Sequence, residues 1–223
     1  MAIRSHGTPV KICGITRLED ALVAAEAGVA AIGFIFWPPG KRYIAPSKAA
    51  EIVRALPAEI ARVGVFLNED PATIRAVRDG VGLTHVQLHG DESPDMAHAL
   101  PGPVIKAFRG RIEQARLAAY RTLAGLLLEG YSEVAPGGTG TAADEMSAQL
   151  LAGDSKFILS GGLVAESVAI AIRRFNPAAV DVASGVETAP GIKDHDRIRA
   201  FIAACAPPSR NRAAIPGFSG VPD

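Results

Sequence analysis

Short apolar runs alternate with amphipathic stretches along most of the chain, and this alternation limits the possible folds more than any other feature. Each run is rich in Val, Ile, Leu and Phe, and a stretch with helical spacing follows it. Strands that are apolar throughout are typical of a parallel sheet covered on both faces, so each unit predicts a strand and its covering helix. The eight predicted strands are 10–13, 31–36, 62–67, 85–88, 104–108, 125–128, 157–160 and 180–183.

Turn and cap residues mark several of the predicted helices. Asp70 and Ser93 each precede a proline, which predicts an N-cap followed by proline at the first helical position. Ser47 follows Pro46 at another predicted start, and Gly28 and Gly80 lie where left-handed turns would end helices. The predicted helices are 18–27, 47–56, 71–79, 94–100, 112–120, 144–151, 165–175 and 194–204.

Eight consecutive units predict one closed barrel. The length of 223 residues suits either two small domains or one barrel. An open sheet of eight strands would leave two long edges to protect, so we expect a single α/β (β/α)₈ (TIM) barrel over residues 1–206. Residues 207–223 are rich in Pro, Ser, Gly and Arg without any period, and we expect a disordered tail there.

Composition narrows the class of partner. The formal net charge is +0 and the basic residues are scattered, which argues against binding to nucleic acid or to an anionic membrane surface. No apolar run is long enough to span a membrane. The two cysteines, Cys13 and Cys205, have no metal-ligand spacing, which predicts neither a disulfide framework nor a metal site. We therefore expect a cytoplasmic protein with a small-molecule partner.

In a barrel of this kind the active site lies at the carboxyl ends of the strands. The residues there are therefore the candidates for chemistry: Cys13, Arg42, Gln87, His89, Lys106, Arg109, Glu129, Gly161, Gly162, Asp181, Ser184 and Gly185.

Small residues follow the last two predicted strands. Gly161 and Gly162 come after the seventh strand, and Ser184 and Gly185 come after the eighth. Such residues let backbone N–H groups approach an anion closely, although either pair alone could merely permit a tight turn. Two pairs on adjacent strands favour a phosphate site.

Six ordered motifs resemble the phosphoribosylanthranilate isomerase family over about residues 10–204. The resemblance implies a cofactor-free, metal-free Amadori rearrangement in tryptophan biosynthesis. Its substrate would be N-(5-phosphoribosyl)anthranilate and its product 1-(2-carboxyphenylamino)-1-deoxyribulose 5-phosphate. The motifs are Lys-Ile-Cys-Gly-Ile-Thr at 11–16, Gly-Phe-Ile-Phe at 33–36, Val-Gln-Leu-His-Gly at 86–90, Pro-Gly-Gly-Thr-Gly at 136–140, Ser-Gly-Gly-Leu at 160–163 and Asp-Val-Ala-Ser-Gly-Val-Glu at 181–187.

The resemblance also implies an acid and a base. Cys13 would be the general base, although a lone cysteine is more often an inert buried side chain. The family has an aspartate as general acid where this chain has Glu129, one methylene longer. Burial could raise the pKa of such a carboxyl group enough to keep a proton available, whereas a solvated loop carboxylate is the alternative.

Substrate contacts follow from the same resemblance. Arg42 would bind the anthranilate carboxylate, with Gly40 where the family has a serine, or it could be a surface arginine. Asp181 would accept a hydrogen bond from the substrate amino group, or serve as a capping or ion-paired carboxylate. Gly138 is a further predicted binding residue.

Gln87 and His89 receive no catalytic step, because only alternate residues of a strand face the barrel interior. Two rival functions stay open at this point. The sister isomerase of histidine biosynthesis uses two aspartates and a substrate with two phosphates, and Cys13 argues against it. A barrel that binds phosphate without turnover is the other. A monomer and a homodimer are both compatible with the sequence.

Overall fold

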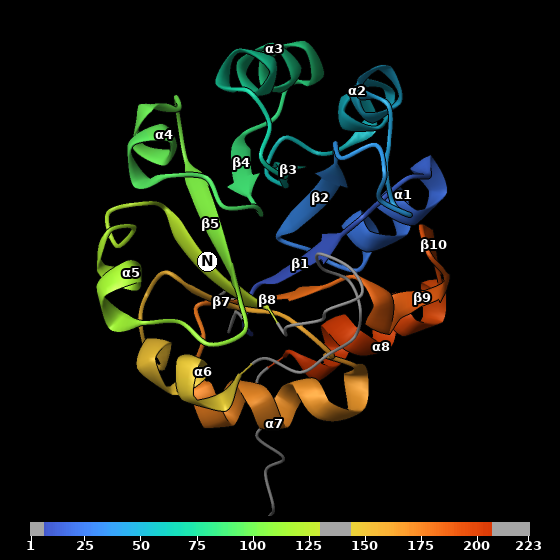
Figure 1. Ribbon diagram of the computed structural model, residues 1–223. Coiled ribbons are helices and arrows are strands. Elements are labelled where there is room, and N and C mark those ends of the chain that lie inside the picture. Colours follow the sequence, from blue (N-terminus) through green and yellow to red (C-terminus); the bar gives the residue numbers. More distant parts are fainter. Residues whose placement is uncertain (1–6, 130–143, 207–223) are drawn as a thin grey trace, which may run out of the picture.

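The predicted strands pair in chain order and close on themselves. The computed structural model describes residues 7–129 and 144–206, and β1 pairs in parallel with both β2 and β8 (Figure 1). The predicted strand bounds agree with the structure to within one residue, and the barrel is confirmed. The strands are β1 (Val10–Cys13), β2 (Ala31–Ile35), β3 (Ala61–Phe66), β4 (His85–Leu88), β5 (Val104–Arg109), β6 (Gly125–Glu129), β7 (Phe157–Leu159) and β8 (Ala179–Val182).

Helices surround the barrel, one after each strand (Figure 1). They are α1 (Leu18–Glu26), α2 (Pro46–Ala55), α3 (Pro71–Val81), α4 (Pro94–Ala99), α5 (Gln114–Ala118), α6 (Glu145–Leu151), α7 (Ala165–Phe175) and α8 (His195–Ala204).

The two predicted N-caps and the turn at Gly28 are confirmed, the start predicted at Ser47 is off by one residue, and the end predicted at Gly80 is wrong. The side chains of Asp70 and Ser93 accept hydrogen bonds from backbone N–H groups in the first turns of α3 and α4. Helix α2 instead begins at Pro46, whose missing N–H and fixed φ suit the first helical position, so Ser47 is no cap. Helix α3 continues through Gly80, and Gly82 takes the left-handed conformation with φ of 80°. Gly28 does follow α1 in such a turn, with φ of 90°.

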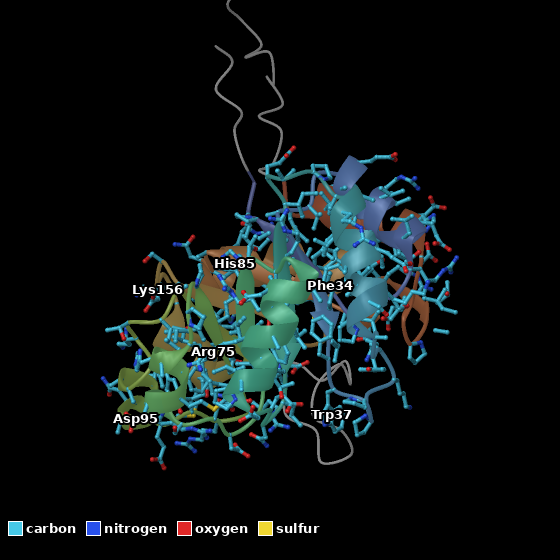
Figure 2. All side chains as sticks on the ribbon, turned by 90° about the horizontal axis from the view of Figure 1, so that it is seen from above. Phe34, Trp37, Arg75, His85, Asp95 and Lys156 are labelled. Carbon is cyan, nitrogen blue, oxygen red and sulfur yellow. The ribbon has the colours of Figure 1, made fainter. Side chains whose placement is uncertain are left out.

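Two apolar layers form the core. The larger lies between the strands and the helices and includes Phe34, which Figure 2 shows deep among the side chains, whereas Asp95 lies at the edge. The smaller layer fills part of the barrel interior with Val63, Ile105, Ala107 and Leu127. Register places polar side chains beside it: Lys11 pairs with Ala31, Gln87 with Ile105, and Asp181 with Lys11. The interior is therefore charged toward the carboxyl ends of the strands.

A small hairpin after β8 was not predicted. The turn η1 (Ser184–Val186) leads into β9 (Glu187–Ala189), which pairs antiparallel with β10 (Ile192–Lys193). Strands this short show no period, and only the Pro-Gly dipeptide at 190–191 signals the turn. The hairpin carries two buried charged side chains, Glu187 and Lys193, to the barrel mouth.

Two of the sequence predictions, the tail at 207–223 and Gly138, lie outside the described residues. Within residues 7–129 and 144–206, no helix is long and apolar enough to cross a membrane.

The Asp70 cap yields a stability prediction. Replacing Asp70 with Ala leaves two N–H groups of α3 without their side-chain acceptor, so the free energy of unfolding should fall by about 1 kcal/mol in urea denaturation. Ser47→Ala is the matched control, because Ser47 is exposed and caps nothing. Equal effects of the two substitutions would contradict this account of the helix starts.

Candidate active site

Cys13 ends β1 with its thiol inside the barrel, opposite Gly33 of β2. A Cβ on Gly33 would lie 2.8 Å from Cys13 Sγ and 3.2 Å from Lys11 Cε, so the missing side chain leaves room for both groups. Burial raises the pKa of the Cys13 thiol, while the ammonium groups of Lys11 and Lys193 act against that rise. The predicted base thus occupies a buried position between two cations.

Lys11 joins Cys13 to Asp181. Its ammonium nitrogen lies 2.7 Å from Asp181 Oδ1, and both side chains are buried. Burial disfavours the charged lysine, but the Asp181 carboxylate and the Cys13 sulfur raise the pKa of Lys11 above its usual value. Ser160 Oγ donates to Asp181 Oδ2 at 3.3 Å. Asp181 is therefore an ion-paired carboxylate in this structure, the alternative that the sequence left open, and it lies within β8 rather than at its end.

Glu129 ends β6 as a buried residue with 7% exposure, so it is no solvated loop carboxylate. Its Oε2 lies 2.7 Å from His89 Nε2, and His89 Nδ1 lies 3.0 Å from Gln87 Nε2. Gln87 and His89 are two residues apart, so alternation turns both side chains inward. Alternation therefore gives no ground for doubting that both residues face the interior, because it separates neighbours and not residues i and i+2.

Arg42 is half-buried rather than on the surface, with a side chain that is 11% exposed. Its Nε and Nη2 donate to Glu187 Oε1 and Oε2 at 2.8 and 2.7 Å, a fork-to-carboxylate contact. Gly14, with φ of 73°, makes this possible, because a Cβ there would lie 2.6 Å from Arg42 Cδ. The guanidinium interacts electrostatically with both Cys13 and Glu129.

Glu187 and Lys193 complete this cluster, and sequence reasoning assigned neither a role. Lys193 Nζ donates to Glu187 Oε1 at 2.8 Å and to the Cys13 carbonyl oxygen at 2.7 Å. Burial opposes ionisation of Glu187, but Arg42 and Lys193 hold the pKa of that carboxyl below its usual value. In the sequence, Glu187 is marked only by its place at the end of the motif at 181–187.

The loops after β7 and β8 touch each other. Gly161 and Gly162 adopt φ of 93° and 63°, which side chains disfavour. A Cβ on Gly185 would lie 2.0 Å from the Leu163 carbonyl oxygen, so only glycine fits between the loops. Ser184 and Gly185 lie in η1. The four predicted phosphate-binding residues thus lie in two adjoining turns.

Two further candidates come from β5. Lys106 is fully buried and donates to the Gly90 carbonyl oxygen at 2.6 Å and to Glu92 Oε2 at 2.9 Å, which fixes the loop after His89. Arg109 pairs in register with Glu129.

The fold and these side chains define a (β/α)₈-barrel enzyme with acid–base groups at the carboxyl ends of its strands. The family model described as N-(5'phosphoribosyl)anthranilate (PRA) isomerase matches residues 10–204. The chain belongs to this family, as the sequence motifs predicted, and is an isomerase of tryptophan biosynthesis.

Individual relatives agree with this assignment. The chain is 48% identical over 197 residues to N-(5'-phosphoribosyl)anthranilate isomerase of Nitrosomonas eutropha, covering 86% of this chain and 94% of the relative. A crystal structure of the Thermotoga maritima isomerase is 41% identical, with a TM-score of 0.79 over 89% of this chain and 98% of the other. A second structure, 40% identical with a TM-score of 0.76 over 89% and 98%, holds reduced 1-(o-carboxyphenylamino)-1-deoxyribulose 5-phosphate. A third, 38% identical with a TM-score of 0.73 over 89% and 98%, concerns monomers generated from the dimeric T. maritima isomerase.

The space opposite Gly33 yields a prediction. Gly33→Ala should displace the Cys13 thiol and lower kcat by roughly 10- to 100-fold, because misplacing a reacting group by about 1 Å is that costly. Gly80→Ala is the control, since its Cβ meets nothing within 4 Å and lies on a helix. Normal turnover in a folded Gly33→Ala protein, judged by circular dichroism, would refute this role for Gly33.

Proposed function

We propose that Cys13 and Glu129 carry out the Amadori rearrangement of N-(5-phosphoribosyl)anthranilate to 1-(2-carboxyphenylamino)-1-deoxyribulose 5-phosphate. The observation that carries the proposal is that both groups end parallel strands of one closed barrel, so they share the rim that also carries the loop of Arg42. Cys13 and Glu129 end strands β1 and β6, and both interact electrostatically with Arg42. A substrate whose carboxylate is bound by Arg42 would lie between the acid and the base.

Glu129 acts first, as the general acid. Its carboxyl group gives a proton to the furanose ring oxygen, the bond from C1 to that oxygen breaks, and the freed oxygen becomes the C4 hydroxyl. The amino nitrogen supplies the electron pair for the C1=N bond, so an iminium ion forms. Asp181 orients the substrate N–H and stabilises the positive charge on nitrogen. The ion pair with Lys11 at 2.7 Å reduces the net negative charge of Asp181 that the nitrogen experiences.

Cys13 acts second, as the general base. The thiolate removes the proton from C2, and the electrons of the C–H bond form C1=C2 while the C1=N pair returns to nitrogen. The enolamine then gains a proton at C1 and loses one from the C2 hydroxyl, which gives the ketone. Atoms and electrons balance within one substrate molecule, so the steps require no cofactor and no metal.

The remaining predicted residues bind the ends of the substrate. Backbone N–H groups of the turns at Gly161 and Gly162 and at Ser184 and Gly185 bind the phosphate, as glycine turns at this end of a barrel commonly do. Gly138 would add to this binding surface. The guanidinium of Arg42 binds the anthranilate carboxylate, and its fork-to-carboxylate contact with Glu187 holds it in position for this role.

Partner and location follow from the same reading. A phosphorylated small molecule is the partner, and the balanced charge of +0 gives no footprint for nucleic acid. A cytoplasmic enzyme acting as a monomer or a homodimer fits this chemistry.

The test is turnover, followed by the loss of phosphoribosylanthranilate fluorescence. Cys13→Ala should lower kcat by about two to four orders of magnitude, the usual cost of losing a general base. Cys205→Ala is the matched control, since Cys205 is the second buried thiol, at the end of α8 and away from the site. Near-normal turnover in Cys13→Ala would remove the base assignment, and an inactive wild type would indicate a barrel that binds phosphate without turnover.

A further inference from the structure

We propose that His89, held by Gln87, is a positioning residue that fixes the orientation of Glu129 and keeps its transferable proton on the oxygen facing the substrate. The proposal rests on the assignment of Glu129 as the general acid.

The three side chains form one hydrogen-bonded row inside the barrel. Gln87 is 1% exposed, and the side chains of His89 and Glu129 are 11% and 10% exposed. The distances are 3.0 Å from Gln87 Nε2 to His89 Nδ1 and 2.7 Å from His89 Nε2 to Glu129 Oε2. The backbone N–H of His89 donates to the Phe66 carbonyl oxygen at 2.8 Å, which extends the β3–β4 pairing to the residue that carries the imidazole. The row is therefore rigid at its strand end.

The proton positions follow from the donors. The structure places the amide nitrogen of Gln87, a donor, at His89 Nδ1. With this amide orientation Nδ1 accepts, and a neutral imidazole carries its proton on Nε2. Nε2–H in turn donates to Glu129 Oε2. Any proton on the carboxyl group then lies on Oε1, from which it can pass to the ring oxygen.

The same contact serves the step after proton transfer. Once Glu129 has become a carboxylate, the Nε2–H bond becomes charge-assisted and stabilises the negative charge. The opposite tautomer would aim the lone pair of Nε2 at Oε2 and draw the carboxyl proton toward His89. Gln87 thus selects the tautomer that leaves Glu129 able to donate.

The side-chain amide of Gln87 hydrogen-bonds to His89 through its nitrogen. Among the described residues its Oε1 is buried without a hydrogen-bond partner. Leaving a buried amide oxygen unpaired is destabilising, so a glutamine at this position is poorly explained by packing alone. Within the described residues, its side-chain hydrogen bond is to His89.

The length of Glu129 explains why a clamp is needed here. The family has the shorter aspartate at this position, and glutamate adds a rotatable bond that must be held for the proton to be delivered in one direction. Charged groups from the neighbouring elements contribute to any pH profile: Arg42 after β2 interacts electrostatically with Glu129 and with Cys13 of β1, and Arg109 of β5 pairs in register with Glu129.

The experiment combines single and double variants with the turnover assay. His89→Ala should lower kcat by roughly 10- to 100-fold with KM changed less than about threefold, because orientation is lost and substrate contacts stay. Glu129→Gln should cost more, and the double variant should be no slower than Glu129→Gln alone. His89→Gln, which keeps an N–H donor, should recover most of the turnover, and His98→Ala on exposed α4 should change nothing.

The pH profile of kcat separates positioning from simple packing. Gln87→Glu places an acceptor at Nδ1 and reverses the tautomer preference, so it should move the pH profile, whereas Gln87→Leu should lower kcat at every pH. Multiplicative losses in the double variant, or a His89→Ala effect confined to KM, would overturn the proposal. Undiminished turnover in Glu129→Gln would instead overturn the acid assignment itself.

Discussion

The ion pair between Lys11 and Asp181 is the interaction on which the site depends. Burying each charge costs several kcal/mol, and the pair is tolerated because its 2.7 Å contact, with Ser160 bonded to the same carboxylate, replaces lost water. The Lys11–Asp181 pair occupies interior space that apolar side chains fill elsewhere in the barrel. Gly33 leaves room for Lys11 and Cys13 side by side, so the Cys13 thiol is held next to a cation by the fold itself.

Three further ion pairs hold the segments that border this centre. Glu187 on the short hairpin binds both Arg42 and Lys193, which ties the hairpin to the loop after β2 and to the Cys13 carbonyl oxygen. Glu92 and Lys106 fix the loop after His89. Charges that would destabilise an apolar core therefore set the positions of the groups proposed to bind substrate and transfer protons.

The sequence predicts the barrel well, because each strand and helix is a local pattern of ten or so residues. It also points to Cys13, Arg42 and Glu129, since strand ends in a barrel share one rim. It does not predict the partners. Lys11 and Asp181 are 170 residues apart and Arg42 and Glu187 are 145 apart, so only the closed register brings them together. The row of Gln87, His89 and Glu129 also depends on packing between strands and cannot be read from one strand. The hairpin of β9 and β10 is too short for periodicity to show.

The central claim, that the buried ion pair sets the reactivity of the Cys13 thiol, is tested most directly by the pH dependence of Cys13 alkylation with iodoacetamide. A Cys205→Ser background leaves Cys13 as the single thiol of the chain. Lys11→Met removes the neighbouring cation and should move thiolate formation to higher pH by about one unit or more, whereas Asp181→Asn removes an anion and should move it lower. Circular dichroism would confirm that each variant is folded. The same pH dependence in all three proteins, or a shift of Lys11→Met to lower pH, would contradict the account.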